Sequence, residues 1–542
     1  MKPKILILIA LVTFSFQLST FNCYSQSWQW AKSGGGSATD DGASVCQDNN
    51  GNVYMAGWYD NAPYSATNGV FDTITIPYIG VSQIFLVKYS SIGNVQWAKS
   101  IGGNNVSDSI PEQPAVVIYE PVSNAIYLTG KYNNTIVLGN DTLSGNGFFF
   151  AKLSTGGSYI WAKKLNISWA SALTSDNLGN IYIGGHCSTN TTFDTVSVTG
   201  NFIAKFNSSG NCLKANSNFA GCFPVKISFK KGNLYMVGVV NNDTIQLDTL
   251  PKTFSGSNNA FISKFNTNLR MKWAKFMTTT SIYTGVSDIC TDSVCNSYSV
   301  GHFTTNINFG SVNLTTSGPE DLFIAKYDSN GVFQWAKQGY NTTGGVYSPF
   351  CKSLNNGDFY IAGTYDGTEL KLGTYTISYV NAYIAQYNSS GNCSGVVTIP
   401  GGGYCQDLSV DASNNFCVIG YFINTLNIGA YSVTSHGFGD VYTAKHDQIT
   451  RVGMRYVNTG NQLVIYANPN AGKCTITIPN EFKTETKLTL QIFDNNGQLL
   501  QQTPVEMMQD KISVNITAEA KGIYTAVLSN GIKSYTGKII FE

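Results

Sequence analysis

The chain has 542 residues, of which 13% are aromatic and only 12% are charged, and it carries 54 glycines and a formal net charge of +1. Aromatic residues favour strands and glycines favour tight turns, so this composition predicts an all-β protein. The near-neutral charge excludes an electrostatic nucleic-acid interface. Only three arginines are present, Arg270, Arg451 and Arg455, which disfavours a polyanionic ligand because arginine supplies the planar fork that recognises phosphates and carboxylates.

The first 25 residues have the pattern of a secretory signal peptide. Lys2 and Lys4 precede the apolar run Ile5–Val12, and small polar residues follow up to a cleavage point before Gln26. The apolar run is too short to span a bilayer, and no later stretch reaches 18 apolar residues. We therefore expect residues 1–25 to be removed during export to the periplasm, and the mature form to have no transmembrane helix.

Three short signals recur along the chain, seven times each. The first is an apolar residue, Tyr, two residues and Gly, at Val53–Gly57, Ile126–Gly130, Ile181–Gly185, Leu234–Gly238 and Phe359–Gly363, with weaker copies at Ser297–Gly301 and Phe416–Gly420. The second is an aromatic-led run that in most copies ends in Lys and an aromatic residue, at Phe85–Tyr89, Phe149–Leu153, Phe202–Phe206, Phe261–Phe265, Phe323–Tyr327, Tyr383–Tyr387 and Tyr442–His446. The third is Trp-Ala-Lys at Trp30, Trp97, Trp161, Trp273 and Trp335, with degenerate copies near Leu213 and Gly395. Internal repeats of this period are typical of radial or stacked architectures.

Each repeat predicts four strands, which we call A to D from the axis outward. The order of the signals leaves an unpartnered D strand at Ser27–Lys32 and no D strand after Tyr442–His446. We therefore predict a seven-bladed β-propeller over residues 26–446, closed by the N-terminal strand, because an open array would expose two sheet edges. The repeats resemble the β-propeller repeat family of large bacterial exported proteins.

After a linker at 447–461, residues 462–542 change to alternating strands that predict a small β-sandwich. The module contains Tyr466-x-Asn-Pro-Asn-x-Gly472, Ile492-Phe-Asp-Asn-Asn-Gly497, Gly522-Ile-Tyr524 and a terminal Gly-Lys-Ile-Ile. These motifs resemble the type A C-terminal sorting domain of the Bacteroidota type IX secretion system, with Ala467 where that family usually has proline. The predicted sorting-motif residues are Asn468, Pro469, Asn470, Gly472, Gly497, Gly522, Tyr524 and Lys538.

The resemblance implies recognition by the type IX secretion machinery at the outer membrane and cleavage by a sortase-like protease. The cargo would then be released or joined to lipopolysaccharide at the cell surface. An accessory β-sandwich with no sorting role is the alternative.

The residues give no catalytic, cofactor-binding or metal-binding constellation. No Gly-x-Ser-x-Gly, His-Glu-x-x-His or phosphate-loop motif occurs. His186 and His302 both follow the glycine of the first signal, as expected for occupants of one variable repeat position. Aspartates that end the A strands, such as Asp48, are expected to cap turns and not to hold calcium. Cys212 with Cys222, and Cys290 with Cys295, are candidate disulfide pairs or buried thiols.

An Asp-Ser/Thr pattern followed by an aliphatic residue recurs in the propeller region. It resembles the O-glycosylation acceptor sequence of Bacteroidota, and a repeated turn explains it equally well. The acceptor hydroxyls would be those of Thr73, Ser109, Thr142, Thr195, Thr244, Thr249 and Ser293.

Together these features predict a secreted or cell-surface protein whose propeller is a non-enzymatic platform for binding or adhesion to an extracellular ligand, a glycan or a protein. The alternative is a secreted glycan- or peptide-active enzyme with an axial site. That enzyme would need two carboxylates in proximity, and Asp288 and Asp292 are the candidates.

Overall fold

A computed structural model describes residues 27–449 and 463–541 in two compact units separated near Met454. The gaps in this description are 61–67, 78–81, 103–115, 241–243, 254–258, 282–283, 379–381, 484, 486, 495–498, 506–509, 518, 520 and 531–533. The predicted signal peptide and most of the predicted linker therefore lie outside the described residues. No helix in the described part is long and apolar enough to cross a membrane.

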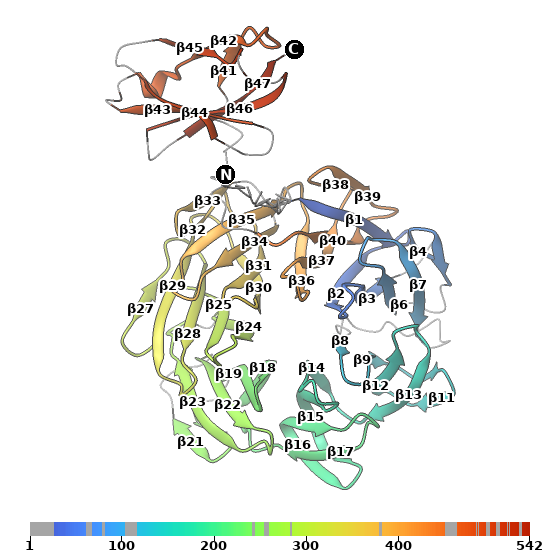
Figure 1. The fold of residues 1–542 in the computed structure, drawn as a ribbon. Helices are drawn as coiled ribbons and strands as arrows, with labels where there is room; N and C mark the ends of the chain where they lie inside the picture. The colour runs from blue at the N-terminus through green and yellow to red at the C-terminus, as the bar shows by residue number, and fades with distance from the viewer. Residues whose placement is uncertain are drawn as a thin grey trace, which may run out of the picture. The chain divides into compact units, whose positions relative to one another are not determined.

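The first unit is a ring of seven antiparallel sheets around an axis (Figure 1). Its A strands are β2 (Asp40–Gln47), β8 (Val116–Glu120), β14 (Trp169–Ser175), β18 (Cys222–Lys230), β24 (Gly285–Thr291), β30 (Val346–Ser353) and β36 (Tyr404–Val410). Its B strands are β3 (Val53–Asp60), β9 (Ala125–Tyr132), β15 (Ile181–Phe193), β19 (Asn233–Val240), β25 (Ser297–Phe303), β31 (Phe359–Tyr365) and β37 (Phe416–Phe422). Its C strands are β6 (Ser82–Tyr89), β12 (Gly147–Ser154), β16 (Val196–Phe206), β22 (Asn259–Asn266), β28 (Asp321–Tyr327), β34 (Ala382–Tyr387) and β40 (Asp440–His446). Its D strands are β7 (Val95–Ile101), β13 (Tyr159–Leu165), β17 (Cys212–Asn216), β23 (Met271–Met277), β29 (Phe333–Asn341), β35 (Cys393–Ile399) and, for the seventh blade, β1 (Trp28–Gly35).

The ring is closed as the sequence predicts. β1 pairs antiparallel with β40, with Trp30 opposite Lys445 and Ser33 opposite Tyr442, so the start and the end of the repeat array share one sheet. The Trp28 ring packs edge-on against His446, with ring centroids 4.9 Å apart. The prediction of a seven-bladed propeller sealed by its N-terminal strand is confirmed.

The three repeat signals meet at the seam between neighbouring blades. Trp161 Nε1 and Lys152 Nζ of the second blade both donate to the Ser208 carbonyl in the C–D turn of the third blade, each at 3.2 Å. Lys152 also lies over the Tyr127 ring, 5.3 Å from its centroid. The turn needs a glycine at Gly210, where φ is +74° and a Cβ atom would lie 2.8 Å from the Trp161 ring. The Trp-Ala-Lys tryptophan thus packs between blades.

A β-hairpin follows the B strand in each blade, in addition to the four strands that the repeat signals predict. These hairpins are β4 (Gly69–Phe71) with β5 (Ile74–Ile76), β10 (Thr135–Leu138) with β11 (Asp141–Ser144), the joined ends of β15 and β16, β20 (Thr244–Leu247) with β21 (Leu250–Thr253), β26 (Asn306–Asn308) with β27 (Asn313–Thr315), β32 (Glu369–Leu372) with β33 (Tyr375–Ser378), and β38 (Thr425–Ile428) with β39 (Tyr431–Thr434). Two of them pair directly with the D strand of the preceding blade, β4 with β1 and β32 with β29. They form a second seam between blades at the perimeter.

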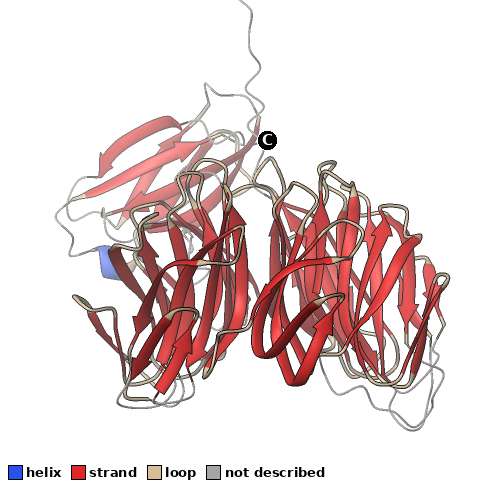
Figure 2. Cartoon of the chain, turned by 90° about the horizontal axis from the view of Figure 1, so that it is seen from below, coloured by secondary structure: helices blue, strands red, loops and turns tan. Residues whose placement is uncertain are grey.

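The second unit is a two-sheet sandwich. One sheet contains β41 (Val464–Tyr466), β42 (Lys473–Thr477) and β45 (Lys511–Asn515), and the other contains β44 (Leu499–Val505), β43 (Leu488–Phe493), β46 (Gly522–Ser529) and β47 (Ser534–Phe541). Ile476 and Val514 from the first sheet share one core with Leu490, Ala526 and Ile539 from the second. A single 3-10 turn, Asn480–Phe482, is the one helical element among the described residues (Figure 2). The predicted small β-sandwich is confirmed.

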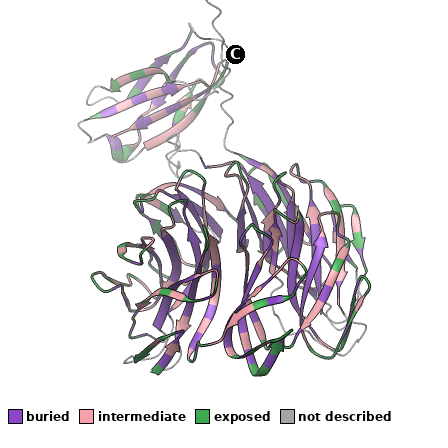
Figure 3. Ribbon diagram, turned by 60° about the horizontal axis from the view of Figure 1, so that its bottom comes forward, coloured by how far each residue is buried: buried purple, intermediate pink, exposed green. Residues whose placement is uncertain are grey.

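Burial follows the strands in both units (Figure 3). The B and C strands are almost continuously buried, for example β31 and β34, because neighbouring blades cover both faces of each sheet. All eleven described cysteines are free, so neither candidate disulfide pair is formed in this structure. Burial raises the pKa of the Cys212 thiol to about 11 and that of the Cys222 thiol to about 12.

The closure predicts a measurable cost for losing Trp30. Its ring is 4% exposed, stacks on Tyr89 with centroids 5.8 Å apart, and donates from Nε1 to the Ser91 carbonyl at 3.1 Å. Trp30→Ala should lower the free energy of unfolding by about 3–5 kcal/mol, as expected for a buried aromatic side chain. Trp30→Phe keeps an aromatic ring but loses the hydrogen bond to the Ser91 carbonyl. It should therefore lower the free energy of unfolding by about 1 kcal/mol relative to wild type. Urea denaturation of the full chain measures both, and equal stability of Trp30→Ala and wild type would contradict the closure.

Candidate binding site at the propeller axis

The A strands change register close to the propeller axis. Bulges interrupt the A–B pairing in β2, β14, β18, β24, β30 and β36. In β2 the shift lies between Gly42 and Ser44, and in β36 it lies between Cys405 and Asp407. A bulge leaves one residue unpaired and re-aims it, so the inserted Ala43 and Gln406 can face the axis while their neighbours stay in the sheet.

A hollow of about 340 Å³ lies at this level. It is lined by Asp41, Gly42, Ala43, Ser44, Trp58, Val116, Trp169, Ser171, Val225, Lys226, Phe350 and Gln406, which come from six of the seven blades. Most of these residues stand at the beginning of A strands, around the centre of the ring in Figure 1. We call this hollow the axial mouth.

The axial mouth combines aromatic faces with hydrogen-bonding groups. Trp58 and Trp169 are partly exposed, whereas Phe350 is buried. Gln406 Nε2 donates to Asp41 Oδ2 at 3.3 Å, which orients both side chains at the rim. Such a mixture of apolar faces and a few positioned polar groups is typical of small-molecule sites.

The repeat signals did not predict a role for the tryptophans of the axial mouth. Trp58 and Trp169 lie outside the Trp-Ala-Lys repeat, at the end of β3 and the start of β14. Their departure from the repeat pattern is the one signal by which they could have been found, because the bulges that turn neighbouring residues toward the axis leave no mark in the sequence.

Two carboxylates near the axis are held in an ion cluster. Lys352 Nζ lies 3.2 Å from Asp288 Oδ2 and 3.8 Å from Asp407 Oδ1, linking the fifth, sixth and seventh blades. Asp407 Oδ2 also accepts from the Val45 N–H at 3.0 Å. Although burial lowers the pKa of Lys352, the two carboxylates raise it well above its ordinary value. This cluster fastens A strands to one another around the axis.

The hydrogen bonds of Asp288 and Asp292 give no support to the suggested pairing of these two carboxylates. The two residues are separated by four positions along an extended chain, about 13 Å at 3.3 Å per residue. Asp288 faces Lys352, whereas Asp292 accepts from the Val294 and Asn296 N–H groups and from the Tyr298 hydroxyl at 2.8–3.1 Å. Each carboxylate therefore has its own structural partners.

The aspartates at the ends of A strands cap the A–B turns. Asp48 accepts from the Asn50 and Asn52 N–H groups through Oδ1, at 2.9 and 3.0 Å, and from the Asn52 side chain and the Tyr54 hydroxyl through Oδ2. Asp176, Asp292 and Asp411 repeat this arrangement. Turn capping accounts for the pattern, and no group of three or more potential metal ligands gathers within the described residues.

The structure also gives a physical reason for the Asp-Thr pattern. Asp72, Asp194 and Asp248 are the first turn residues of the perimeter hairpins, with φ between +52° and +56°. Gly373 and Gly429 occupy the same position in other blades, with φ of +64° and +60°. Aspartate tolerates this left-handed conformation better than most residues. The aspartate side chain also accepts a hydrogen bond that glycine cannot. Asp194 Oδ2 accepts from the Cys212 N–H at 2.5 Å, and Asp248 Oδ2 accepts from the Met271 N–H at 2.8 Å.

Six of the seven proposed acceptor residues are described, and all six are exposed: Thr73, Thr142, Thr195, Thr244, Thr249 and Ser293. The first five lie on the perimeter hairpins, and Ser293 lies in an A–B turn. Ser109 lies outside the described residues. The position of the hydroxyls is thus compatible with modification, while the aspartates have a structural role of their own.

In the second unit, the first sorting motif holds the last strand. Asn468 Nδ2 donates to the Lys538 carbonyl and its Oδ1 accepts from the Ile540 N–H, both at 2.7 Å. Asn470 N–H donates to the Ile540 carbonyl at 2.8 Å, and its side chain accepts from the Gly472 N–H. Pro469 stands between the two asparagines. The motif residues at 468–472 and Lys538 therefore form one connected group.

The remaining motif residues are more scattered. Gly522 begins β46, and Tyr524 is buried opposite Ile539 of β47. Gly497 lies outside the described residues. Their assignment as sorting residues stays a prediction.

Asn468→Ala should loosen the terminal strand. It removes two hydrogen bonds at an exposed position, which corresponds to about 1–2 kcal/mol. Amide exchange of the Ile540 N–H in the full chain should accelerate about ten-fold, while Asn468→Asp, which keeps the acceptor and loses the donor, should give a smaller effect. Unchanged amide exchange at Ile540 in Asn468→Ala would contradict the role of Asn468 in holding the terminal strand.

Comparison with known proteins assigns the second unit. Residues 464–542 match the family described as "Secretion system C-terminal sorting domain". The family implies export to the cell surface or the exterior and interaction with the type IX secretion machinery.

The propeller has more distant relatives. The chain is 24% identical over 506 residues to an "Uncharacterized WD repeat-containing protein L264" of Acanthamoeba polyphaga mimivirus, with 82% of this chain and 34% of that protein covered. Similar solved structures include the β-propeller domain of the Trilobed protease from Pyrococcus furiosus, with a TM-score of 0.39, 9% identity and coverage of 76% of this chain and 98% of that one. Drosophila Semaphorin 2a has a TM-score of 0.42 and 9% identity, with 96% and 98% of the two chains covered. The chain thus spans about a third of the length of this curated protein, and it joins a seven-bladed β-propeller to a segment, residues 464–542, that matches the secretion system C-terminal sorting domain.

Proposed function

We propose that this protein is an exported, non-enzymatic binding protein whose axial mouth holds an extracellular glycan. The observation that supports this most directly is the partly exposed pair of tryptophans, Trp58 and Trp169, in a hollow that also contains Gln406, Asp41 and Ser171. Aromatic faces pack against the C–H faces of sugar rings, and amide, carboxylate and hydroxyl groups bond the sugar hydroxyls.

The charge of the axial mouth favours a neutral glycan. Its lining contains one carboxylate, Asp41, and one ammonium, Lys226, and it contains no arginine. An anionic sugar would be recognised better by paired arginines, which bind carboxylates bidentately. We therefore expect neutral hexose units as the ligand, presented either on a free glycan or on a glycoprotein to which the cell adheres.

The route to the surface belongs to the same proposal. Residues 1–25 direct export to the periplasm, and residues 462–542 then direct passage across the outer membrane. A sortase-like protease removes the sorting domain within or near the linker at 447–461, and the propeller of residues 26–446 acts at the cell surface or free in the medium.

A glycan- or peptide-active enzyme is the second candidate. It is supported by Asp41, a carboxylate at the rim of the hollow, and it would require a second catalytic group there. Product analysis separates the two functions, because a binding protein returns the ligand unchanged.

Glycan-array binding of the full chain tests the first candidate. Trp58→Ala and Trp169→Ala should each weaken binding of the best neutral glycan at least ten-fold, or about 1.4 kcal/mol. Phe438→Ala, which removes an exposed aromatic side chain that does not line the axial mouth, is the control and should bind as wild type does. Absence of any glycan binding by folded protein would contradict the proposal, and release of shorter oligosaccharides would establish the enzyme instead.

We also propose that the exposed Asp-Ser/Thr hydroxyls carry O-linked glycans after export. Thr195→Ala should reduce the intact mass of the exported protein by one glycan and leave its melting temperature unchanged, because Thr195 is an exposed turn residue. Asp194→Gly should keep the turn, as Gly373 does, and should also abolish modification at Thr195. An intact mass equal to that of the polypeptide alone would exclude the modification.

A further inference from the structure

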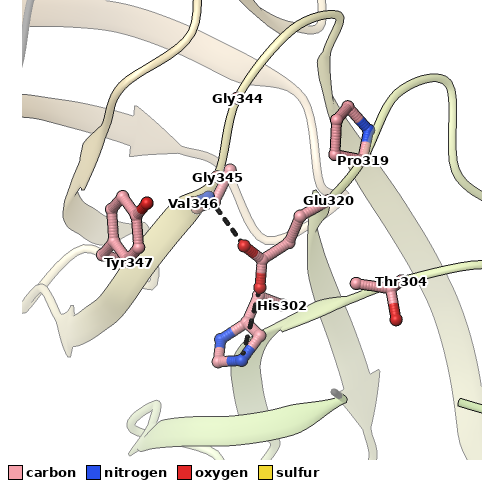
Figure 4. Close-up of a pocket in the computed structure, with 8 residues that line it drawn as sticks. All are labelled: His302, Thr304, Pro319, Glu320, Gly344, Gly345, Val346 and Tyr347. Atoms are coloured by element: carbon pink, nitrogen blue, oxygen red, sulfur yellow. Dashed lines mark hydrogen bonds and ion pairs between the residues drawn. The ribbon is translucent and has the colours of Figure 1, made fainter. Parts of the chain in front are cut away.

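A second hollow lies apart from the axial mouth, between the fifth and sixth blades. Its volume is about 410 Å³, and Figure 4 shows its lining: His302, Thr304, Pro319, Glu320, Gly344, Gly345, Val346 and Tyr347. None of these residues lines the axial mouth. They come from the end of β25 and the B–C connection of the fifth blade, and from the start of β30 and the connection before it, so we call this hollow the interblade pocket.

Glu320 is the central polar group of the interblade pocket. Its Oε2 accepts from the Val346 N–H at 3.3 Å, and its Oε1 lies 3.5 Å from His302 Nε2 (Figure 4). Burial raises the pKa of Glu320 to about 7, with further contributions from Asp366 and Asp321, and burial lowers the pKa of His302. The histidine is therefore neutral near pH 7 and does not supply a compensating positive charge.

The other side of the pocket carries a tyrosine and a further carboxylate. The Tyr347 side chain is exposed, and its hydroxyl donates to Asp366 Oδ2 at 2.8 Å. Asp366 Oδ1 accepts from the Gly345 N–H at 2.5 Å. These bonds fix the ring at the edge of the pocket and leave a face of it open to a ligand.

The hydrogen-bond donors and acceptors that line the interblade pocket indicate the kind of ligand it can bind. The Gly345 and Val346 N–H groups and the Tyr347 hydroxyl already donate to the two carboxylates. His302 faces Glu320 with Nε2, and its buried Nδ1 is not accessible to a ligand, so the free acceptors are the carboxylate oxygens. No lysine or arginine lines the pocket. The pocket thus offers acceptors, negative charge and an aromatic face, which together suit a ligand that only donates hydrogen bonds and carries positive charge.

We propose that the interblade pocket binds a primary alkylammonium group. The ammonium would lie against the Glu320 carboxylate, with its first methylenes and its charge against the Tyr347 ring. Three donors on an ammonium match this acceptor-rich lining. A neutral sugar fits less well, because its hydroxyls also need donors that the pocket has already used.

The pH dependence has a definite sign. The charged and titratable groups around Glu320 are His302 on β25, Asp321 on β28, Tyr347 on β30 and Asp366 after β31. A bound cation favours the ionised carboxylate, so affinity should rise as pH rises through about 7. Between pH 6 and pH 8 the ionised fraction of such a carboxyl rises about ten-fold, while an alkylammonium with a lysine-like pKa of about 10.4 stays protonated.

Calorimetric titration of the full chain with n-butylammonium chloride tests the proposal, with n-butanol as the uncharged analogue of the same shape. We expect saturable binding at pH 8, about ten-fold weaker binding at pH 6, and no binding of n-butanol. Glu320→Gln should lower the affinity at pH 8 at least ten-fold. Glu369→Gln, which removes a carboxylate paired with Lys371 at 2.7 Å on the hairpin of the sixth blade, is the matched control and should bind as wild type does.

A second variant tests the proposal independently if Glu320→Gln does not fold. Tyr347→Leu changes an exposed side chain and should weaken binding several-fold while the melting temperature stays close to that of wild type. Equal binding of n-butanol, pH-independent affinity, unchanged affinity in Glu320→Gln, or preferential binding of methyl glucoside would each overturn the proposal. Because the glycan proposal depends on Trp58 and Trp169, failure of one proposal leaves the other standing.

Discussion

The pairing of β1 with β40 is the contact on which the whole propeller depends. It joins residues more than 400 positions apart, and it supplies the D strand that the seventh blade lacks. Without it, β40 would present an unpaired edge and the Trp28 and Trp30 rings would lose their partners in the seventh and first blades. The six other blades complete their own sheets, but the spacing of every A strand around the axis is fixed only when the ring is closed.

Two sets of contacts between neighbouring blades, here called seams, hold the closed ring together. At the first seam the lysine and the tryptophan donate to one carbonyl in the next C–D turn, as Lys264 and Trp273 do at Ser329, and the lysine lies over the ring of the repeat tyrosine. At the perimeter the hairpins reach back to the preceding blade, as Asp248 N–H does to the Asn218 carbonyl. The repeat signals are therefore contact residues between blades, which is why they recur without forming a site.

Both candidate sites use side chains at variable positions of the repeat. The axial mouth forms where A strands bulge and where Trp58 and Trp169 replace smaller residues, and the interblade pocket forms where His302 and Glu320 meet the Gly344-Gly345 turn. The carboxylates that belong to regular positions, Asp48 and Asp292, are used in turns. A regular scaffold with local departures can therefore hold ligands without losing the contacts that stabilise the ring.

The sequence by itself determined the number of blades, the four strands of each blade, the N-terminal closure, and the sorting domain with its sandwich fold. These features follow from local periodicity and from counting repeats, and each signal lies within a few residues of the strand that it marks. Only the tertiary structure decided which side chains meet. Asp288 joins Lys352 and not Asp292, and His302 meets Glu320. Those encounters depend on the bulges in the A strands and on the angle between blades, and neither leaves a periodic mark in the sequence.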